Sequence, residues 1–456
     1  MLQPANRLPP EVISRIAQCF LDEYSFNSKS ILPLTHVCRY WRESIISAPE
    51  NWTLISPYHV NLAALSLERS KAAPLQLRLD MYSVTQEPEF CSLIIPHVHK
   101  TETLQFGGLT TVEDFVQALP DFPRSMPHLR SLVLERFNDD PKWDSSIDPF
   151  ESFSNTLRSL SLLDTPLYPF FLKLRTLTKL SLLYYKIHVP LDGLLDVLEE
   201  NRSLKSVDLV INSKGFPAEI SRYRVVVLGQ LQHLSITSLD ASITRTLISI
   251  IPLRKGAHLE ITSRDRTTEL GLNYILSGIS TAHLSNLLSP TFMEYGCSFR
   301  VIRLNGPNGS FSYSRDWPPV VPFAEFPVLP LTNIQELLLV HCELAAVPHP
   351  SSFPTLETLT IKCHADISYF FSALFPHPSF FRSLKILGFF ECVITEGFLE
   401  ELARFASARK NTDSARLHRV VITRRDGDFP SVALIHELEK HVPVVDVGPA
   451  ERYRRV

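Results

Sequence analysis

The sequence predicts an α/β protein, in which a small amino-terminal module of three helices precedes a curved, horseshoe-shaped solenoid of short strands and helices. Two observations support this prediction. Residues 8–55 carry apolar side chains at helical spacing between proline-rich and polar breaks. A leucine pattern then recurs along most of the remaining chain, at intervals of about 20 to 28 residues in its regular parts. We expect short parallel strands on the concave face of the solenoid and helices on its convex face.

The predicted domains follow these two patterns. Residues 1–56 form the helical module, residues 57–100 form a linker and the amino-terminal cap of the solenoid, and residues 101–456 form the repeat domain with its carboxyl-terminal cap. The chain of 456 residues contains 34 prolines against 15 glycines. This composition favours many short, stiffly connected elements over domains joined by flexible linkers.

The helical module carries more apolar surface than it can bury. Pro9 and Pro10 suit the first turn of a helix, and Val12, Ile13 and Ile16 follow at the three- and four-residue steps of one helix face. After a polar break, a short apolar turn leads into a further helix that ends at a proline. Because small domains bury a low fraction of their surface, part of this apolar surface should meet a partner.

The sequence of this module resembles the F-box family. The resemblance lies in three stretches: LPPEVISRI at residues 8–16, LTHVCRYWRESI at residues 34–45 and APENW at residues 48–52. It implies docking onto the Skp adaptor of a cullin–RING ubiquitin ligase. The side chains that would face the adaptor are Leu8, Pro9, Val12, Ile13, Ile16, Leu34, Val37 and Trp41, with Trp52 closing the module. The alternative is a self-contained helical cap that buries the same residues against the rest of the chain.

The repeated pattern has the form L-x-x-L-x-L. Its clear copies start at Leu129, Leu157, Leu177, Leu204, Leu231, Phe299, Ile334, Leu356, Leu384 and Leu417, and weaker copies start at Thr101 and Gly256. Such intervals are typical of leucine-rich repeats, in which each unit buries its leucines only by stacking on its neighbours. With the linker around Leu67, the chain resembles fungal F-box proteins with leucine-rich repeats, which implies a substrate receptor of an SCF-type cullin–RING ligase.

Further elements are expected between the copies of the repeat. Apolar residues at helical spacing predict helices over residues 112–119, 191–201, 280–288, 398–410 and 431–441. A closing strand is expected at residues 444–447. Two intervals are too long for single repeats and predict excursions over residues 262–298 and 306–330. The second is rich in proline and aromatic residues and is predicted to be a surface loop, either a plain spacer or a binding loop.

The residues between the leucines of each copy point away from the stack, because side chains alternate along a strand. Small hydroxyl side chains dominate these outward positions in the first half of the array, and larger apolar side chains dominate them in the second half. We predict that a protein substrate binds the apolar group formed by Leu338, Val340, Ile386 and Phe390. The alternative is that residues 306–330 or the carboxyl terminus cover this group.

Composition and charge argue against several classes of function. The formal net charge of −3 and the pI of about 6.6 leave no basic footprint for nucleic acid or anionic lipid, so we expect protein partners. The seven cysteines are scattered and form no CxxC motif, which suits free thiols in a reducing compartment. We find no signal-peptide core and no apolar run that could span a bilayer, and we expect the protein in the cytoplasm, the nucleus or both.

The sequence carries no recognisable catalytic motif. It contains no P-loop, no GxSxG and no HExxH, and we predict neither catalytic residues nor a cofactor. The pairs His341-Cys342 and Cys363-His364 could be two half-sites of a tetrahedral zinc centre. Each pair follows a predicted strand, however, where stacking explains the cysteines as small buried hydrophobic residues. We therefore predict no metal site.

The function that these patterns predict is substrate recognition for an SCF-type E3 ubiquitin ligase. The helical module would bind the Skp adaptor and thereby join the cullin scaffold, while the repeats would hold a protein substrate near the ubiquitin-carrying enzyme. One alternative is a non-catalytic leucine-rich-repeat scaffold with a repurposed F-box-like segment. Another is an enzyme on a repeat scaffold, against which stands the lack of any nucleophile paired with a base.

Overall fold

The computed structural model divides the chain into two compact units. Unit 1 comprises Met1–Pro217 and Val226–Gln230, and unit 2 comprises Ala218–Val225 and Leu231–Val456. The predicted domain boundaries at residues 56 and 100 both fall inside unit 1. The structure describes residues 8–23, 28–80, 88–109, 126–136, 155–165, 167, 169–184, 191–211, 224–264, 275–277, 290, 292–296, 301–307, 309–315, 331–340, 352–363, 367–375, 381–410, 412, 414–424 and 432–449.

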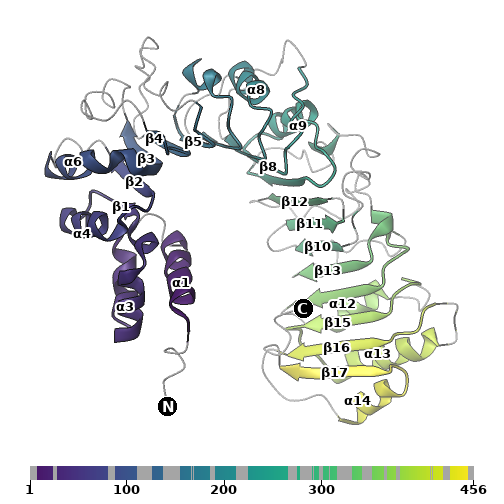
Figure 1. Cartoon of the computed structure of the whole chain (residues 1–456). Helices are drawn as coiled ribbons and strands as arrows, with labels where there is room; N and C mark the ends of the chain where they lie inside the picture. The colour runs from purple at the N-terminus through teal and green to yellow at the C-terminus, as the bar shows by residue number, and fades with distance from the viewer. Residues whose placement is uncertain are drawn as a thin grey trace. The chain divides into compact units, whose positions relative to one another are not determined.

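Unit 1 begins with a cluster of short helices (Figure 1). Its elements are α1 (Pro10–Glu23), η2 (Ser28–Ser30), α2 (Ile31–Thr35), α3 (Arg39–Ser47) and η3 (Pro49–Trp52). The cluster has a core of its own, made of Ile13, Ala17, Ile31, Ile45 and Trp52, each at most 1% exposed. We call these elements the helical module from here on.

The rest of unit 1 is a parallel sheet whose strands pair in chain order. The strands are β1 (Leu54–Ile55), β2 (Leu75–Asp80), β3 (Thr101–Leu109), β4 (Ser131–Arg136), β5 (Ser159–Leu163), β6 (Lys179–Tyr184) and β7 (Ser206–Ile211). The connections contain α4 (Val60–Ser70), α6 (Pro88–Ile94), η4 (Ile95–Lys100), η6 (Pro169–Lys173) and α8 (Leu191–Glu200). Because β1 directly follows the helical module and pairs with β2, the module and the sheet are continuous.

Alternation along the strands explains why this sheet forms. In β5, Leu160 and Leu162 are fully buried, whereas Ser159 and Ser161 are partly exposed on the opposite face. The leucines of neighbouring strands are in register, since Leu160 lies opposite Leu132 of β4. Each strand therefore covers the apolar face of the next, which a single isolated unit could not do.

A buried asparagine joins two of the segments that connect the strands of unit 1. The side-chain oxygen of Asn201 accepts a hydrogen bond from the backbone N–H of Leu177 at 3.1 Å. Its side-chain nitrogen donates to the carbonyl oxygen of Val197 at 2.9 Å, and Asn201 is fully buried. Because both backbone groups lie away from water, this amide satisfies polar groups that would otherwise be unpaired.

Asn201→Ala is expected to lower the free energy of unfolding by about 1–3 kcal/mol, because it leaves a buried N–H and a buried C=O without partners. Urea denaturation followed by circular dichroism measures this change. Asn155→Ala is the matched control, because Asn155 is exposed. Equal stability of the two variants would show that the Asn201 amide is not needed.

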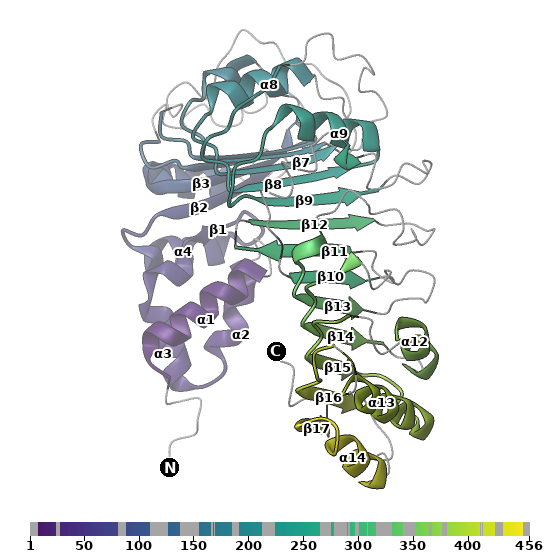
Figure 2. The same ribbon diagram turned by 90° about the vertical axis from the view of Figure 1, so that its right-hand side faces the viewer.

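Unit 2 is also built on one mostly parallel sheet. In spatial order its strands are β8 (His233–Ser238), β9 (His258–Ser263), β12 (Gly309–Arg315), β11 (Val301–Gly306), β10 (Phe292–Gly296), β13 (Glu336–Val340), β14 (Thr358–Lys362), β15 (Ile386–Phe390), β16 (Arg419–Arg424) and β17 (Val444–Pro449). Its helices include α9 (Ala241–Ile250), η8 (Leu331–Asn333), α12 (Ile367–Leu374), α13 (Glu396–Arg409) and α14 (Val432–Glu439). Figure 2 shows α12, α13 and α14 beside the strands from β14 to β17.

One part of the unit 2 sheet is antiparallel, contrary to the prediction from the sequence. β12 pairs in parallel with β9 and antiparallel with β11, and β11 pairs antiparallel with β10. The copy of the repeat that starts at Phe299 was expected to be an ordinary parallel strand, but its Ile302 and Leu304 belong to the reversed strand β11. The pairing of β11 with β12 places Gly306 opposite Gly309, and Gly309 has a φ of 142° that favours glycine.

The predicted surface loop over residues 306–330 is likewise wrong for Gly309–Arg315, which form β12. Phe311 and Tyr313 are buried, and the serines that alternate with them, Ser310, Ser312 and Ser314, face the other side of the sheet. The polar and aromatic residues of SFSYS therefore alternate as strand residues do. The predicted excursion over residues 262–298 also contains a strand, β10. Residues 316–330 lie outside the described part of the chain.

The remaining element predictions divide into two groups. The helices expected at residues 191–201, 398–410 and 431–441 are confirmed as α8, α13 and α14, and the closing strand is confirmed as β17. The helices expected at residues 112–119 and 280–288 lie outside the described residues. The α/β class is thus confirmed, with a mostly parallel sheet in each unit. Within the described residues, no helix has the length and apolar character needed to cross a bilayer.

Candidate binding surfaces

The helical module exposes apolar side chains that the sequence assigned to adaptor binding. Val12 is 42% exposed and Ile16 is 38% exposed, and both lie on one face of α1 because they are four residues apart. Val37, in the turn between α2 and α3, is 52% exposed, and Pro9 is also exposed. Three further residues of the predicted set are partly buried against the module core, namely Leu8, Leu34 and Trp41.

Two residues of the predicted set belong to the core instead. Ile13 is 0% exposed and Trp52 is 1% exposed. The indole N–H of Trp52 donates to the carbonyl oxygen of Ile45 at 3.0 Å, and the Arg69 guanidinium lies 4.4 Å from the centre of the Trp52 ring. Neither Ile13 nor Trp52 offers surface to a partner, so the candidate docking set narrows to Leu8, Pro9, Val12, Ile16, Leu34, Val37 and Trp41.

Polar contacts hold the helices of the module in place beneath this surface. The Ser14 hydroxyl lies 3.0 Å from a Glu50 carboxylate oxygen and 3.1 Å from the Asn51 side-chain oxygen, which connects α1 to η3. The Tyr40 hydroxyl donates to the carbonyl oxygen of Leu8 at 3.0 Å. These contacts could not be predicted from the sequence, because hydrogen bonds between helices leave no local pattern. They orient the helices that carry the exposed residues.

The four residues predicted to bind substrate share one face of the unit 2 sheet, but they do not form one continuous apolar patch. Leu338 and Val340 lie on β13, whereas Ile386 and Phe390 lie on β15. Strand β14 lies between them and places Thr360 opposite Leu338 and Lys362 opposite Val340. The two apolar pairs are therefore separated by about 10 Å, two strand spacings. All four side chains are partly exposed.

A glycine allows the aromatic part of this face to exist. A Cβ atom at Gly388 would lie 2.8 Å from a ring carbon of Phe390 and 3.2 Å from the Thr360 hydroxyl oxygen. The Phe390 ring therefore lies over its own strand in space that another residue would fill. Beside it, the Lys362 ammonium pairs with the Glu391 carboxylate at 3.0 Å. The outward face at β15 thus combines an aromatic ring with an ion pair.

A second, polar area of the same sheet lies on β8, β9 and β12. The rings of His233 and His258 stack with their centroids 5.0 Å apart, and Nδ1 of His258 forms a hydrogen bond with the Ser310 hydroxyl. Burial and the neighbouring His233 lower the pKa of His258 below its ordinary value. The Thr262 and Ser314 hydroxyls lie 2.9 Å apart. This area was not predicted from the sequence, because Ser310 and Ser314 lie in the segment that was expected to be a loop.

Two cysteines meet in the core of unit 2. The Sγ atoms of Cys363 and Cys392 are 3.4 Å apart, and both side chains are at most 9% exposed. This burial confirms the interpretation of Cys363 as a core residue. His341, Cys342 and His364 lie outside the described residues. In the part of the chain that is described, no three histidine, cysteine or acidic side chains come together as metal ligands would.

The thiols of Cys363 and Cys392 are expected to react with a thiol reagent such as Ellman's reagent only when unit 2 unfolds. The hydrogen bond with Cys363, together with burial, raises the pKa of the Cys392 thiol above its ordinary value, and the reactive thiolate is therefore scarce. The exposed Cys19 should react rapidly in the native protein. The fast phase of the reaction with the native protein should come from exposed thiols such as Cys19. A Cys363→Ser/Cys392→Ser variant should therefore keep the amplitude of this fast phase, and loss of amplitude would contradict the prediction.

Comparisons with known proteins add no assignment to these surfaces. No protein-family model matches the chain, and a search of curated proteins finds no match.

Proposed function

We propose that the chain is the substrate-recognition subunit of an SCF-type E3 ubiquitin ligase. The helical module acts as an F-box that binds the Skp adaptor and thereby the cullin scaffold. The sheets of the two units act as a leucine-rich-repeat array, and the array binds a protein substrate. The chain supplies no catalytic side chain, and it acts in the cytoplasm, the nucleus or both. Its contribution to ubiquitin transfer is proximity, because it holds the substrate near the charged enzyme.

The observation that carries this proposal is the exposed apolar surface of the helical module. The side chains of Val12, Ile16 and Val37 are exposed to solvent, although the same module buries a core of its own. Val12 and Ile16 lie side by side on α1, and neighbouring exposed apolar side chains are typical of a protein interface. They also fall within the stretches that resemble the F-box, so that sequence and exposure indicate the same surface.

The repeat assignment is supported by spacing and pairing together. In the regular parts of the chain, the copies of the leucine pattern form neighbouring parallel strands, for example β4, β5 and β6, with their leucines in register. The antiparallel strand β11 is an insertion into this order. In such an array the outward residues of the strands recognise the substrate, and the Phe390 side chain is the largest apolar group among those predicted.

Co-purification of the full chain with the Skp adaptor tests the proposal. A stoichiometric complex is expected, and a Leu8→Ala/Pro9→Ala variant should lose it because both residues lie at the start of α1 beside the exposed face. An unchanged circular dichroism spectrum would show that the variant is folded. Absence of a complex with the native chain would contradict the proposal and would favour a scaffold with a repurposed F-box-like segment.

A further inference from the structure

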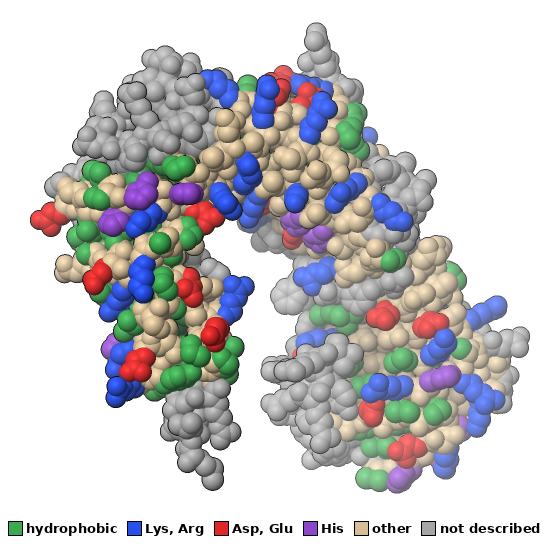
Figure 3. All heavy atoms as spheres, viewed as in Figure 1, with side chains coloured by type: hydrophobic (Ala, Val, Ile, Leu, Met, Phe, Trp, Pro, Cys, Tyr) green, Lys and Arg blue, Asp and Glu red, His purple; other side chains and the backbone are tan. Residues whose placement is uncertain are grey.

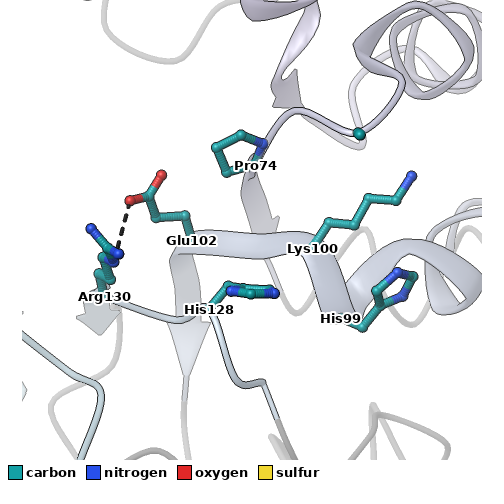
Figure 4. A pocket seen from close by; sticks show the side chains of 7 residues that line it. Pro74, His99, Lys100, Glu102, His128 and Arg130 are labelled. Carbon is teal, nitrogen blue, oxygen red and sulfur yellow. Dashed lines mark ion pairs between the residues drawn. The ribbon is translucent and has the colours of Figure 1, made fainter.

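Unit 1 contains a hollow of about 480 Å³ at one edge of its sheet. Its lining comes from the turn before β2, the end of η4, the first residues of β3, and the residues before β4. Figure 4 shows the labelled side chains that surround it. The lining residues are Ala72, Pro74, His99, Lys100, Glu102, His128 and Arg130. This volume lies within the range of sites that hold whole small molecules.

The strand pairing explains why these residues meet. The backbone N–H of Arg130 donates to the carbonyl oxygen of Glu102 at 2.8 Å, which fixes the start of β4 beside the start of β3. The Lys100 ammonium donates to the carbonyl oxygen of Lys71 at 2.8 Å, which holds the lysine beside the turn before β2. Residues up to 58 positions apart in the chain, from Ala72 to Arg130, thus line one hollow.

The lining is basic. Lys100 and Arg130 carry positive charges against the single carboxylate of Glu102, and two imidazoles stand beside them. Figure 3 shows histidine side chains gathered next to basic side chains over β2 and β3. Burial, followed by the charges of Lys100 and His99, lowers the pKa of the adjacent His97. His97 is therefore harder to protonate, first because it is partly buried and then because positive charges lie beside it.

Arg130 is available to a ligand at little cost. Its Nε lies 3.7 Å from a Glu102 carboxylate oxygen, and the side chains are 70% and 38% exposed. Such a long, exposed ion pair contributes little stability. The guanidinium can therefore turn from Glu102 to an anion, to which it can donate two parallel hydrogen bonds.

We propose that this hollow binds a small phosphate monoester. A phosphate monoester carries close to two negative charges at neutral pH. Arg130 would bind its phosphate group, while Lys100 adds a positive charge on the opposite side of the hollow (Figure 4). Its organic part would contact the apolar surfaces of Ala72 and Pro74 and the faces of the imidazole rings. The size of the hollow favours a free small molecule over a phosphorylated protein segment. The proposal does not depend on adaptor binding, because the hollow shares no residue with the candidate docking set.

Calorimetric titration of the full chain with phenyl phosphate, at constant ionic strength and neutral pH, tests the proposal. Saturable binding at one site is expected, with weaker binding of inorganic phosphate. Arg130→Gln should weaken binding about tenfold or more, because a hydrogen-bonded charge is lost. Glu102→Gln should strengthen binding, because the competing carboxylate is removed. Both positions are exposed enough that the fold should persist, which circular dichroism can confirm.

The matched control is Lys205→Gln, which removes a positive charge at the start of β7, three strands away on the same edge. It should leave the affinity unchanged. Absence of saturable binding, or equal weakening by Lys205→Gln and Arg130→Gln, would overturn the proposal. Equal affinity for inorganic phosphate would overturn the assignment to a monoester. A phosphoserine peptide that binds more than about tenfold tighter than phenyl phosphate would overturn the assignment to a small molecule.

Discussion

Replacing Arg409 with methionine is expected to lower the free energy of unfolding of unit 2 by about 3–5 kcal/mol, among the largest effects of a single substitution. Arg409 is fully buried at the end of α13. Its guanidinium donates to the carbonyl oxygens of Phe381, Leu384 and Ala415 at distances from 2.8 to 3.2 Å, and to that of Arg382 at 3.3 Å. Methionine would fill the volume but remove this donor from all four oxygens, of which those of Phe381 and Arg382 keep a backbone N–H partner.

The charge of Arg409 is part of this contact. Burial lowers its pKa to about 10, which still leaves the guanidinium protonated at neutral pH. Its hydrogen bonds to the four carbonyl oxygens therefore offset the free-energy cost of removing the charged guanidinium from water. The side chain connects the end of α13 to the segments that precede β15 and β16, so its loss should loosen three parts of unit 2 together.

Urea denaturation followed by circular dichroism measures the effect, and Arg404→Met is the matched control. Arg404 lies on the same helix but is exposed, and substitutions at such positions change stability by about 0.5 kcal/mol or less. Arg409→Lys should be intermediate, because an ammonium keeps the charge but cannot reach all the oxygens. Equal stability of the two methionine variants would contradict the role assigned to Arg409.

Val12→Asp is expected to weaken binding to the Skp adaptor about 30-fold or more, the size of a hot-spot loss of at least 2 kcal/mol. Val12 is 42% exposed and stands beside Ile16 on α1, so the aspartate would place a charge in the apolar part of the proposed interface. The fold should persist, because the aspartate can remain in water. Ile13→Asp, by contrast, should unfold the helical module, because Ile13 is fully buried.

Quantitative binding to the purified adaptor, together with circular dichroism of each variant, measures this difference. Ala64→Asp is the matched control, since it introduces the same charge at an exposed position of α4 within unit 1. It should bind the adaptor as the native chain does. If Val12→Asp unfolds the module, Val12 is a core residue; if it binds normally, the docking surface lies elsewhere.

Hydrophobic periodicity in the sequence was sufficient to predict α8, α13, α14 and most of the parallel strands. These elements depend on spacings within one segment, such as the buried Leu160 and Leu162 of β5 with partly exposed serines beside them. The same reasoning failed at β12. The proline and aromatic residues of this segment favoured a loop, although the alternation of serine with Phe311 and Tyr313 was a signal for a strand.

The candidate surfaces were predictable only in part. Helical spacing placed Val12, Ile13 and Ile16 on one apolar helix face. It could not distinguish the exposed Val12 and Ile16 from the buried Ile13, because an apolar helix face can pack against its own core or against a partner. The outward positions of β13 and β15 were correctly placed on one face. Their separation by β14 follows from strand order, and the close approach of Phe390 to Gly388 follows from a side-chain conformation.

The sequence by itself determined the α/β class, the alternation of strands and helices, and the apolar face of α1, because each of these follows from the periodicity of neighbouring residues. The tertiary structure alone decided the order β9, β12, β11, β10 and β13, the burial of Arg409 among backbone carbonyls, and the basic hollow before β2, β3 and β4. These features join residues that are far apart in the chain. Their contacts depend on how whole elements pack, which no local pattern records.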